Sequence, residues 1–328
     1  MIQKKHVIIT VFIVVLMLSG CVSDGGPEAD NGSDTEASEP LKNDTADSDK
    51  NTTGSSGNVS GENASYDGKQ HMGCQPGAIS KNGTCQVAVS EANADIFSAK
   101  DLMPIVSTNT TLGGTPGYLA EPAANGIYPG VLMIHEWWGL NGNIRHMADV
   151  LAGHGYTVFA IDLYGGEVAS NSSEARRLSG RVRENQSEAV EKMENATRDL
   201  RGLSETTGQV ASLGWCFGGG ESLQLSLSDA ELNATVIYYG TVTTNRSKLR
   251  HIDPPVLGIF GEKDQVVPLK TVRKFNRTLT ELGIKHQIEI YPDAGHAFAN
   301  PSGESFHPNA TKDAWNKTLD FLDRNLKG

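Results

Sequence analysis

A cysteine flanked by glycines is the residue best placed for chemistry. The segment 214–220 reads Gly-Trp-Cys-Phe-Gly-Gly-Gly and follows the apolar run Val210–Leu213. Glycines two positions before and two after Cys216 permit a sharp turn from a strand into a helix, which would expose the sulfur at the edge of a sheet. A helix beginning at Phe217 would also favour the thiolate, the nucleophilic form. The pattern predicts a nucleophile; a small buried cysteine after a strand is the alternative.

An aspartate and a histidine follow Cys216, each in a turn after an apolar run. Asp264 comes after Val256–Phe260, and His296 lies in the loop after Gln287–Tyr291. An imidazole near the sulfur would take the thiol proton, and a carboxylate would hold that ring in the required tautomer. The order nucleophile, acid, histidine therefore predicts a cysteine hydrolase.

The elements that position these residues are alternating strand-like and helical segments. Such alternation predicts an α/β fold with a mostly parallel central sheet and helices on both faces. The carboxyl ends of the strands, where α/β sites assemble, would bring the three residues together. The strand-like runs are Val131–His135, Thr157–Ile161, Val210–Leu213, Thr235–Tyr239, Val256–Phe260 and Gln287–Tyr291.

Two helices are indicated by apolar residues at spacings of three and four. One stripe is Ala189, Met193, Ala196, Leu200 and Leu203, and the other is Trp315, Leu319, Leu322 and Leu326. Both are interpreted as core-facing, because such stripes are usually packing surfaces rather than cofactor sites. The segment Asp95–Met103 is expected to be a short strand or the edge of a helix.

Several segments together resemble the dienelactone hydrolase family of the α/β-hydrolase fold, over roughly residues 103–328. The matching segments are Tyr118–Pro122, His135–Asn141, Asp162–Tyr164, Gly214–Gly219, Gly261–Asp264 and Gly295–Phe298. The resemblance implies a triad of Cys216, Asp264 and His296, and hydrolysis of a lactone or small ester through an acyl-cysteine.

The resemblance also implies roles for three further residues. Glu136 would lie near the thiol and help to deprotonate it when substrate arrives. The backbone N–H groups of Trp137 and Phe217 would form the oxyanion hole. No metal is expected at Glu136, because the chain has no HExxH motif and the next histidine is His146. No cofactor is expected either.

Two positions depart from the family pattern. Founding members carry one arginine two residues after the Asp-Leu-Tyr motif and another four residues after the catalytic histidine, and both grip the substrate carboxylate. Gly166 and Asn300 stand there in this chain. Arginine and carboxylate form strong bidentate pairs, so the loss of both removes the anchor for an anionic dienelactone. Asn300 retains one hydrogen-bond donor for a neutral group.

The N-terminus has the features of an exported lipoprotein. Lys4 and Lys5 precede the apolar stretch Val7–Leu18, which suits a signal peptide over residues 1–20. Leu18–Cys21 resembles a lipobox, so Cys21 would begin the mature chain and carry the lipid anchor. A retained signal anchor is the alternative. Residues 21–70 are polar and are expected to be a disordered tether, followed by an extension over 71–102 and the hydrolase domain over 103–328.

Two further features fit an extracytoplasmic location. Cys74 and Cys85 bracket a short loop, and a disulfide between them would staple an element with little core of its own; a zinc site there is disfavoured because neither belongs to a CxxC motif. Asn-X-Ser/Thr acceptors are frequent and indicate a glycosylated surface. They begin at Asn31, Asn43, Asn51, Asn58, Asn63, Asn82, Asn109, Asn171, Asn185, Asn195, Asn233, Asn245, Asn276, Asn309 and Asn316.

Charge limits the classes of partner. The formal net charge is −11, of which the 11 acidic and 3 basic residues of 22–70 contribute −8. The remainder is mildly acidic, which gives no basis for nucleic-acid binding. The expected partners are a small ester or lactone and, through the N-terminus, a membrane. Two alternatives remain open: a non-catalytic ligand-binding lipoprotein on the same scaffold, and a thiol acyltransferase or peptidase.

Overall fold

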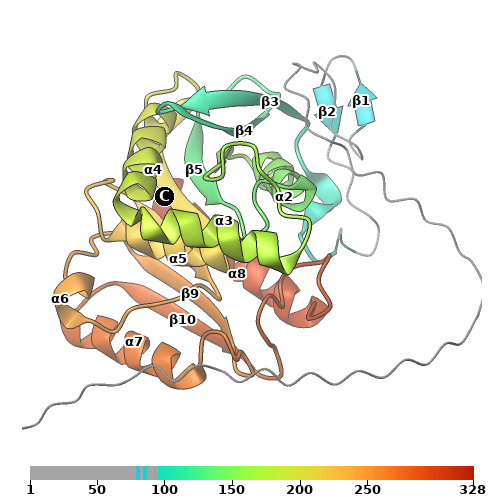
Figure 1. Ribbon diagram of the computed structural model, residues 1–328. Helices are drawn as coiled ribbons and strands as arrows, with labels where there is room; N and C mark the ends of the chain where they lie inside the picture. The colour runs from blue at the N-terminus through green and yellow to red at the C-terminus, as the bar shows by residue number, and fades with distance from the viewer. Residues whose placement is uncertain (1–78, 82–83, 87–92, 94) are drawn as a thin grey trace, which may run out of the picture. The chain divides into compact units, whose positions relative to one another are not determined.

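A mixed sheet forms the centre of the molecule. The computed structural model describes residues 79–81, 84–86, 93 and 95–328 (Figure 1). Its strands lie in the order β1-β2-β3-β4-β6-β5-β7-β8-β9-β10, and the six from β6 to β10 run parallel. They are β1 (Ile79–Lys81), β2 (Thr84–Gln86), β3 (Ile105–Leu112), β4 (Thr115–Pro122), β5 (Tyr128–Ile134), β6 (Thr157–Ile161), β7 (Thr206–Trp215), β8 (Ala234–Tyr238), β9 (Val256–Gly261) and β10 (His286–Tyr291). The expected mostly parallel sheet is confirmed, and each predicted run matches a strand within a few residues.

The antiparallel pair β3–β4 is a hairpin that the apolar pattern did not indicate. Gly113 and Gly114 both have positive φ, 57° and 77°, and such glycines permit the tight turn that joins two paired strands. Along β3 only Ile105 and Leu112 are buried. A strand that buries so few side chains has no apolar run by which the sequence could reveal it.

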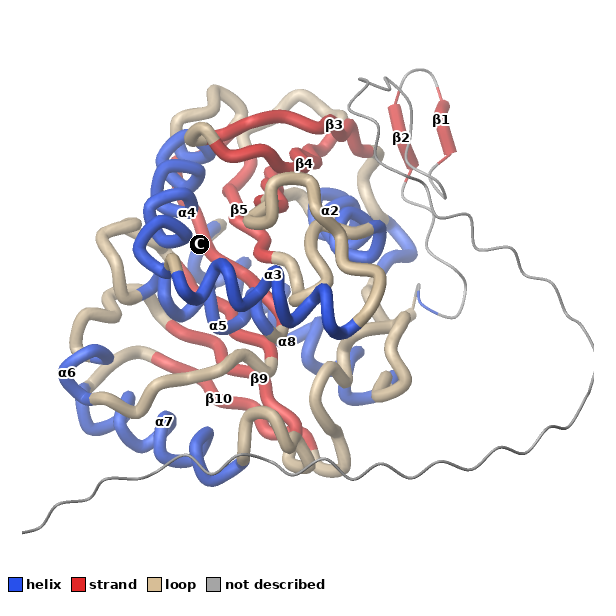
Figure 2. Tube along the Cα trace, in the orientation of Figure 1, coloured by secondary structure: helices blue, strands red, loops and turns tan. Residues whose placement is uncertain are grey.

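Helices cover both faces of the sheet, as expected (Figure 2). They are α2 (Gly142–Gly153), α3 (Ser172–Glu184), α4 (Gln186–Arg201), α5 (Phe217–Ser226), α6 (Arg246–Leu249), α7 (Leu269–Leu282) and α8 (Pro308–Leu326), with a 3-10 turn at Ala99–Asp101. The α2 and α8 side chains share one core cluster, whereas α3, α4 and α5 pack over the other face. Figure 1 shows α7 beside β10 near one end of the sheet.

Strand β7 shows how one run of sequence serves both cores. Ala211, Leu213 and Trp215 point into the α2–α8 cluster, whereas Val210 points into the cluster under α4. This alternation is the period-2 geometry of a strand. The buried stripe of α4 includes Ala189, Met193, Ala196 and Leu200, and that of α8 includes Trp315, Leu322 and Leu326. Both predicted stripes are therefore core-facing.

The segment before β3 is partly anchored to the domain. Ile96 and Phe97 are buried, and the Trp315 indole N–H donates to the Phe97 carbonyl at 2.9 Å. The 3-10 turn that follows takes the place of the expected short strand or helix edge. Cys21 and Cys74 lie outside the described residues, as does the side chain of Cys85. The structure therefore does not test the lipid-anchor and disulfide predictions, which stay predictions. No helix within the described ranges has the length and hydropathy to span a bilayer.

Candidate active site

Cys216 lies at the junction of β7 and α5, at the carboxyl edge of the sheet. Its backbone has φ 52° and ψ −114°, a conformation that non-glycine residues rarely adopt. The Cys216 N–H donates to the Tyr238 carbonyl at 3.0 Å, and the Gly220 N–H donates to the Cys216 carbonyl at 3.1 Å. Neighbouring strand and helix thus hold the strained turn in place, which is typical of a nucleophile elbow.

Two glycines allow the helix to begin so close to the strands. A Cβ at Gly214 would overlap the backbone of Gly218, and a Cβ at Gly218 would overlap the Ile134 carbonyl at the end of β5. Side chains at either position would push α5 away from the sheet. The glycines around Cys216 therefore have the steric reason that their spacing suggested.

His296 joins the cysteine to the aspartate. Its Nε2 lies 3.1 Å from Cys216 Sγ, and its Nδ1 lies 2.9 Å from Asp264 Oδ2. The other Asp264 oxygen accepts from the N–H groups of Val266 and Val267, at 2.7 and 2.9 Å. Since the Asp264 side chain has no exposed surface, its orientation is fixed and it sets that of the imidazole.

The surroundings of His296 favour its charged form. Burial lowers the pKa of the ring, but the hydrogen bonds to Asp264 and Cys216 and the charges of both groups outweigh burial and raise it to about 10. The ring keeps 21% of its side-chain surface exposed. A stable imidazolium beside the sulfur gives a counter-ion to a thiolate and a proton for a leaving group.

Glu136 follows β5 and is buried, with 4% of its surface exposed. The Asn300 amide Nδ2 donates to Glu136 Oε2 at 2.6 Å, and Asn300 Oδ1 accepts from the Ser302 N–H at 2.9 Å. Burial raises the pKa of Glu136 to about 7, although His296 and Asn300 act in the opposite direction. The structure brings Glu136 and Asn300, from distant parts of the chain, into direct contact.

His135 organises the loop that carries Glu136 and Trp137, a function that its sequence position did not reveal. It is fully buried; its Nδ1 donates to the Glu136 carbonyl at 2.7 Å and its Nε2 accepts from the Leu163 N–H at 3.3 Å. Burial lowers the pKa of His135, consistent with a neutral ring in that one tautomer. Its ring also stacks on Phe217, with centroids 5.7 Å apart.

The two expected oxyanion donors belong to residues that take part in this packing. Phe217 is the first residue of α5, so its N–H has no partner within the helix. Trp137 follows β5, and its carbonyl accepts from the Tyr164 hydroxyl at 3.2 Å. The Tyr164 and Phe217 rings are 5.7 Å apart. The loops after β5 and β6 and the start of α5 are therefore held together by aromatic contacts.

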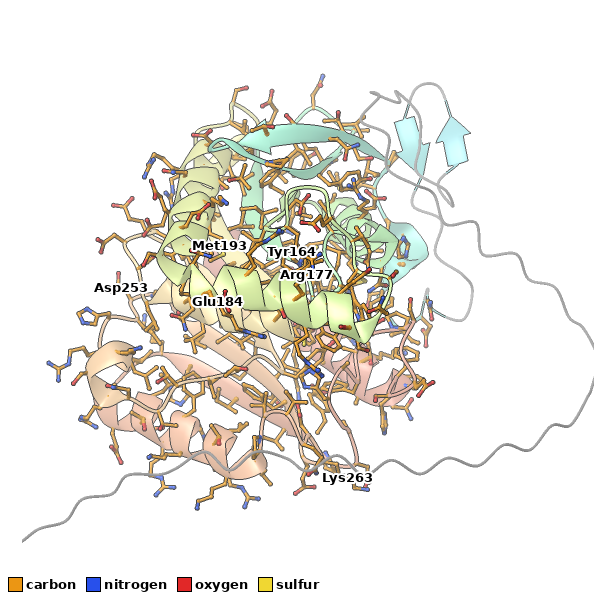
Figure 3. All side chains as sticks on the ribbon, viewed as in Figure 1. Tyr164, Arg177, Glu184, Met193, Asp253 and Lys263 are labelled. Carbon is orange, nitrogen blue, oxygen red and sulfur yellow. The ribbon has the colours of Figure 1, made fainter. Side chains whose placement is uncertain are left out.

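The loop after β6 carries no arginine toward the site. Both carboxylate oxygens of Asp162 accept backbone N–H groups, from Tyr164 at 2.9 Å and Gly166 at 2.6 Å. Gly166 has φ 93°, and the space that a Cβ would enter is open. Tyr164 lies beside α3, the helix that carries Arg177 (Figure 3); Arg177 pairs with Glu167 at 3.0 Å.

Comparison with known proteins agrees with this architecture. The model of the dienelactone hydrolase family matches residues 115–326. "Protein usf" of Aquifex pyrophilus is 32% identical over 217 residues, covering 64% of this chain and 93% of its own, and a "Putative carboxymethylenebutenolidase" of Aquifex aeolicus is 29% identical over 218 residues, covering 64% and 94%.

Solved structures show the same fold. A "Putative Dienelactone Hydrolase" from Klebsiella pneumoniae superposes with a TM-score of 0.60 at 23% identity, covering 67% of this chain and 99% of its own. The dienelactone hydrolase-like promiscuous phosphotriesterase P91 from metagenomic libraries superposes with a TM-score of 0.62 at 22% identity, covering 67% and 98%. The chain therefore belongs to the dienelactone hydrolase family and is a lactone and ester hydrolase of the α/β-hydrolase fold.

Proposed function

We propose that this protein opens a small, neutral lactone or ester through an acyl-cysteine at Cys216. The observation that carries the proposal is the chain of contacts Cys216 Sγ, His296 Nε2, His296 Nδ1 and Asp264 Oδ2, at 3.1 and 2.9 Å. Nucleophile and base lie within hydrogen-bond reach, and a buried third group orients the base. A hydrolase needs each of these groups, whereas a scaffold that only packs needs none of them.

Acylation would begin with attack of the Cys216 thiolate on the substrate carbonyl. The carbonyl oxygen becomes an oxyanion, which the Phe217 and Trp137 N–H groups would stabilise. When the carbon–oxygen ester bond breaks, the His296 imidazolium gives its Nε2 proton to the leaving alkoxide. The products of this half are a thioester on Cys216 and an alcohol, which in a lactone stays attached to the acyl chain.

Deacylation would use the same groups in reverse. Neutral His296 takes a proton from water, and the resulting hydroxide attacks the thioester carbonyl. Collapse of the second oxyanion expels the thiolate and releases the carboxylic acid, which ionises. The imidazolium and the thiolate are regenerated together, and Asp264 keeps the ring in the required tautomer throughout.

Glu136 would act on a resting thiol. A carboxyl whose pKa is about 7 exists in both protonation states near neutral pH, so it can take the thiol proton when His296 has not done so. Its contact with Asn300 holds it 2.6 Å from a neutral amide rather than against a cation. The proton can therefore pass to Glu136 without breaking an ion pair.

A neutral substrate fits the groups that replace the two arginines. Gly166 contributes no side chain, and the Asn300 amide already donates to Glu136 and accepts from the Ser302 N–H. Neither position then offers a cation to a substrate carboxylate, which favours an uncharged acyl or alcohol group.

Placement of the enzyme outside the cytoplasm, anchored by a lipid on Cys21, is a separate part of the proposal. It is supported by the signal-like stretch 7–18, by the lipobox and by the frequent glycosylation acceptors. Its test is a Cys21→Ala variant of the full chain expressed in its native host type. Wild-type protein should partition into detergent and the variant into the aqueous phase. Equal partition of both proteins would contradict the proposed lipid anchor on Cys21.

The catalytic proposal is tested with a panel of neutral lactones, short nitrophenyl esters and an anionic dienelactone. Cys216→Ala and His296→Ala should each reduce hydrolysis to background, and mass spectrometry should find a trapped acyl group on Cys216 of the wild type. His251→Ala, at an exposed histidine just after α6, is the matched control and should retain full activity.

Three outcomes would count against the proposal. Unchanged hydrolysis in Cys216→Ala would exclude the cysteine as nucleophile. Tight binding of a panel compound that is recovered uncleaved would instead favour a ligand-binding protein on the same scaffold. Transfer of the acyl group to an added amine in preference to water would change the reaction class to acyl transfer.

A further inference from the structure

Tyr239 is a buried polar residue that the catalytic proposal does not use. It follows β8, the strand next to β7, and its φ of 35° is in the region that aromatic residues rarely adopt. The residue is fully buried, and its hydroxyl has no hydrogen-bond acceptor among the described residues, although the backbone of Ala299 lies near enough to lower the pKa of the phenol. A strained backbone and a buried hydroxyl without an acceptor are both costly, so their occurrence in one residue calls for a physical reason.

The ring of Tyr239 is part of the site. It meets the His296 imidazole edge-on, with centroids 5.3 Å apart, and the Phe298 ring at 5.6 Å. Burial raises the pKa of the phenol well above its usual range, and the negative charge of Glu136 is the next largest cause. The Glu136 carboxylate therefore opposes ionisation of the phenol, and no direct hydrogen bond joins the two side chains.

A small cavity borders both groups. Glu136, Tyr239 and Asn300 line it together with Asn143 of α2 and Thr311 of α8, and its volume is about 10 Å³. A space of this size accommodates roughly one water molecule when polar partners are present. Glu136 and Tyr239 are both lining residues that carry such polar groups.

Asn300 leaves one oxygen of Glu136 unused. Its amide nitrogen donates to Oε2, and its orientation is fixed because Oδ1 accepts from Ser302. An amide turned the other way would place two acceptors against each other. Glu136 Oε1 therefore needs another donor when the carboxyl is charged.

We propose that Tyr239 is a positioning residue for Glu136, and that the cavity binds one water molecule that accepts from the Tyr239 hydroxyl and donates to Glu136 Oε1. The water would stabilise the charged carboxylate and hold it in the orientation from which it can take a proton. The consequence for catalysis rests on the proposed function, but the water site and the titration of Glu136 do not.

Few other groups act on this titration. His296, after β10, is the titratable group whose charge lowers the pKa of Glu136, and Asn300 is neutral. The cavity walls from α2 and α8 contribute Asn143, Ile144, Met147, Thr311 and Trp315, none of which titrates near neutral pH. Removal of the Tyr239 hydroxyl should therefore act on Glu136 without changing another charge.

The test is a pH titration of the Glu136 carboxyl by infrared absorption of its protonated C=O group. Asp149 is a second buried carboxyl whose pKa burial raises to about 7, so the Glu136 band is assigned by its loss in Glu136→Gln. Tyr239→Phe keeps the ring and removes the donor that orients the water. The midpoint should rise by about one unit, because one hydrogen bond to the charged form is lost.

Tyr238→Phe is the matched control. Tyr238 is adjacent in the chain, is buried and borders the same cavity, but its hydroxyl already has Thr318 Oγ1 as partner at 2.6 Å. It should leave the Glu136 midpoint unchanged. An equal midpoint in Tyr239→Phe and wild type would overturn the proposal.

A second measurement covers the case in which Tyr239→Phe fails to fold. A high-resolution crystal structure of the wild-type protein should show one water within hydrogen-bond distance of both the Tyr239 hydroxyl and Glu136 Oε1. An empty or apolar-filled cavity at that position would overturn the proposal. Loss of ester hydrolysis in Cys216→Ala tests the function separately, so failure of the two ideas can be told apart.

Discussion

Replacement of Asp264 by asparagine isolates the electrostatic part of the site from its geometry. Asparagine has the shape of aspartate, and its amide oxygen can keep the hydrogen bonds from Val266 and Val267. The amide nitrogen then faces His296 Nδ1, where the native carboxylate oxygen lies at 2.9 Å. Because the amide nitrogen is a donor, the ring must present a lone pair at Nδ1 and its proton at Nε2, toward the sulfur.

The expected loss follows from the charge preference of His296. Its pKa is raised from 6.5 to about 10, which corresponds to about 5 kcal/mol in favour of the imidazolium. Asp264 and Cys216 share this effect, so removal of the carboxylate charge accounts for only part of it. The wrong tautomer adds a cost of its own. We expect kcat/KM for a neutral nitrophenyl ester to fall by about 10³ to 10⁴ in Asp264→Asn.

The assay pairs ester hydrolysis with the rate at which iodoacetamide alkylates Cys216, each measured across pH. Iodoacetamide should alkylate the variant more slowly than the wild type at pH values at which His296 is protonated in the wild type. Urea unfolding should show a folded variant. A decrease of less than tenfold in kcat/KM, with an unchanged alkylation profile, would refute the assignment of Asp264 as the residue that orients and charges His296.

Three further predictions concern other residues. Burial raises the pKa of Glu136 from 4.5 to about 7, so the protonated carboxyl stabilises the fold fully below pH 4.5, and this contribution is lost as pH rises through 7. In urea unfolding, Glu136→Gln should therefore be more stable than wild type by up to about 3 kcal/mol at pH 8 and no more stable at pH 4. A Cβ at Gly180 in α3 meets no atom, whereas one at Gly218 would overlap Ile134. In thermal and urea unfolding, Gly180→Ala should be more stable than wild type by about 0.5–1 kcal/mol, and Gly218→Ala less stable by about 2 kcal/mol or more. The reverse order of stabilities would contradict this packing. Asn300→Arg should raise the ratio of kcat/KM for an anionic ester over its neutral analogue by about tenfold, because a guanidinium pairs with a carboxylate; an unchanged ratio would show that this position does not face the substrate.

Much of the fold could be predicted because parallel strands buried on both faces are continuous apolar runs. Val256–Phe260 and Thr157–Ile161 match β9 and β6 closely, since every residue in such a strand is under the same requirement for burial. The β3–β4 hairpin could not be predicted this way. Its first strand is mostly polar and is stabilised by backbone pairing to β4, which leaves no apolar period.

The sequence by itself determined the chemistry on offer: a cysteine between glycines, an aspartate and a histidine after later strands, a glutamate after an early one, and two family arginines replaced by Gly166 and Asn300. These are local patterns of residue type and spacing, so they can be recognised in the sequence without knowledge of the fold. Only the tertiary structure decided that Asn300 donates to Glu136, that the buried His135 ring hydrogen-bonds the loops after β5 and β6, and that Tyr239, whose hydroxyl has no acceptor, lines the same cavity as Glu136. Glu136 is more than one hundred positions from both Asn300 and Tyr239. The approach of polar groups so distant along the chain depends on tertiary packing, which residue spacing does not encode.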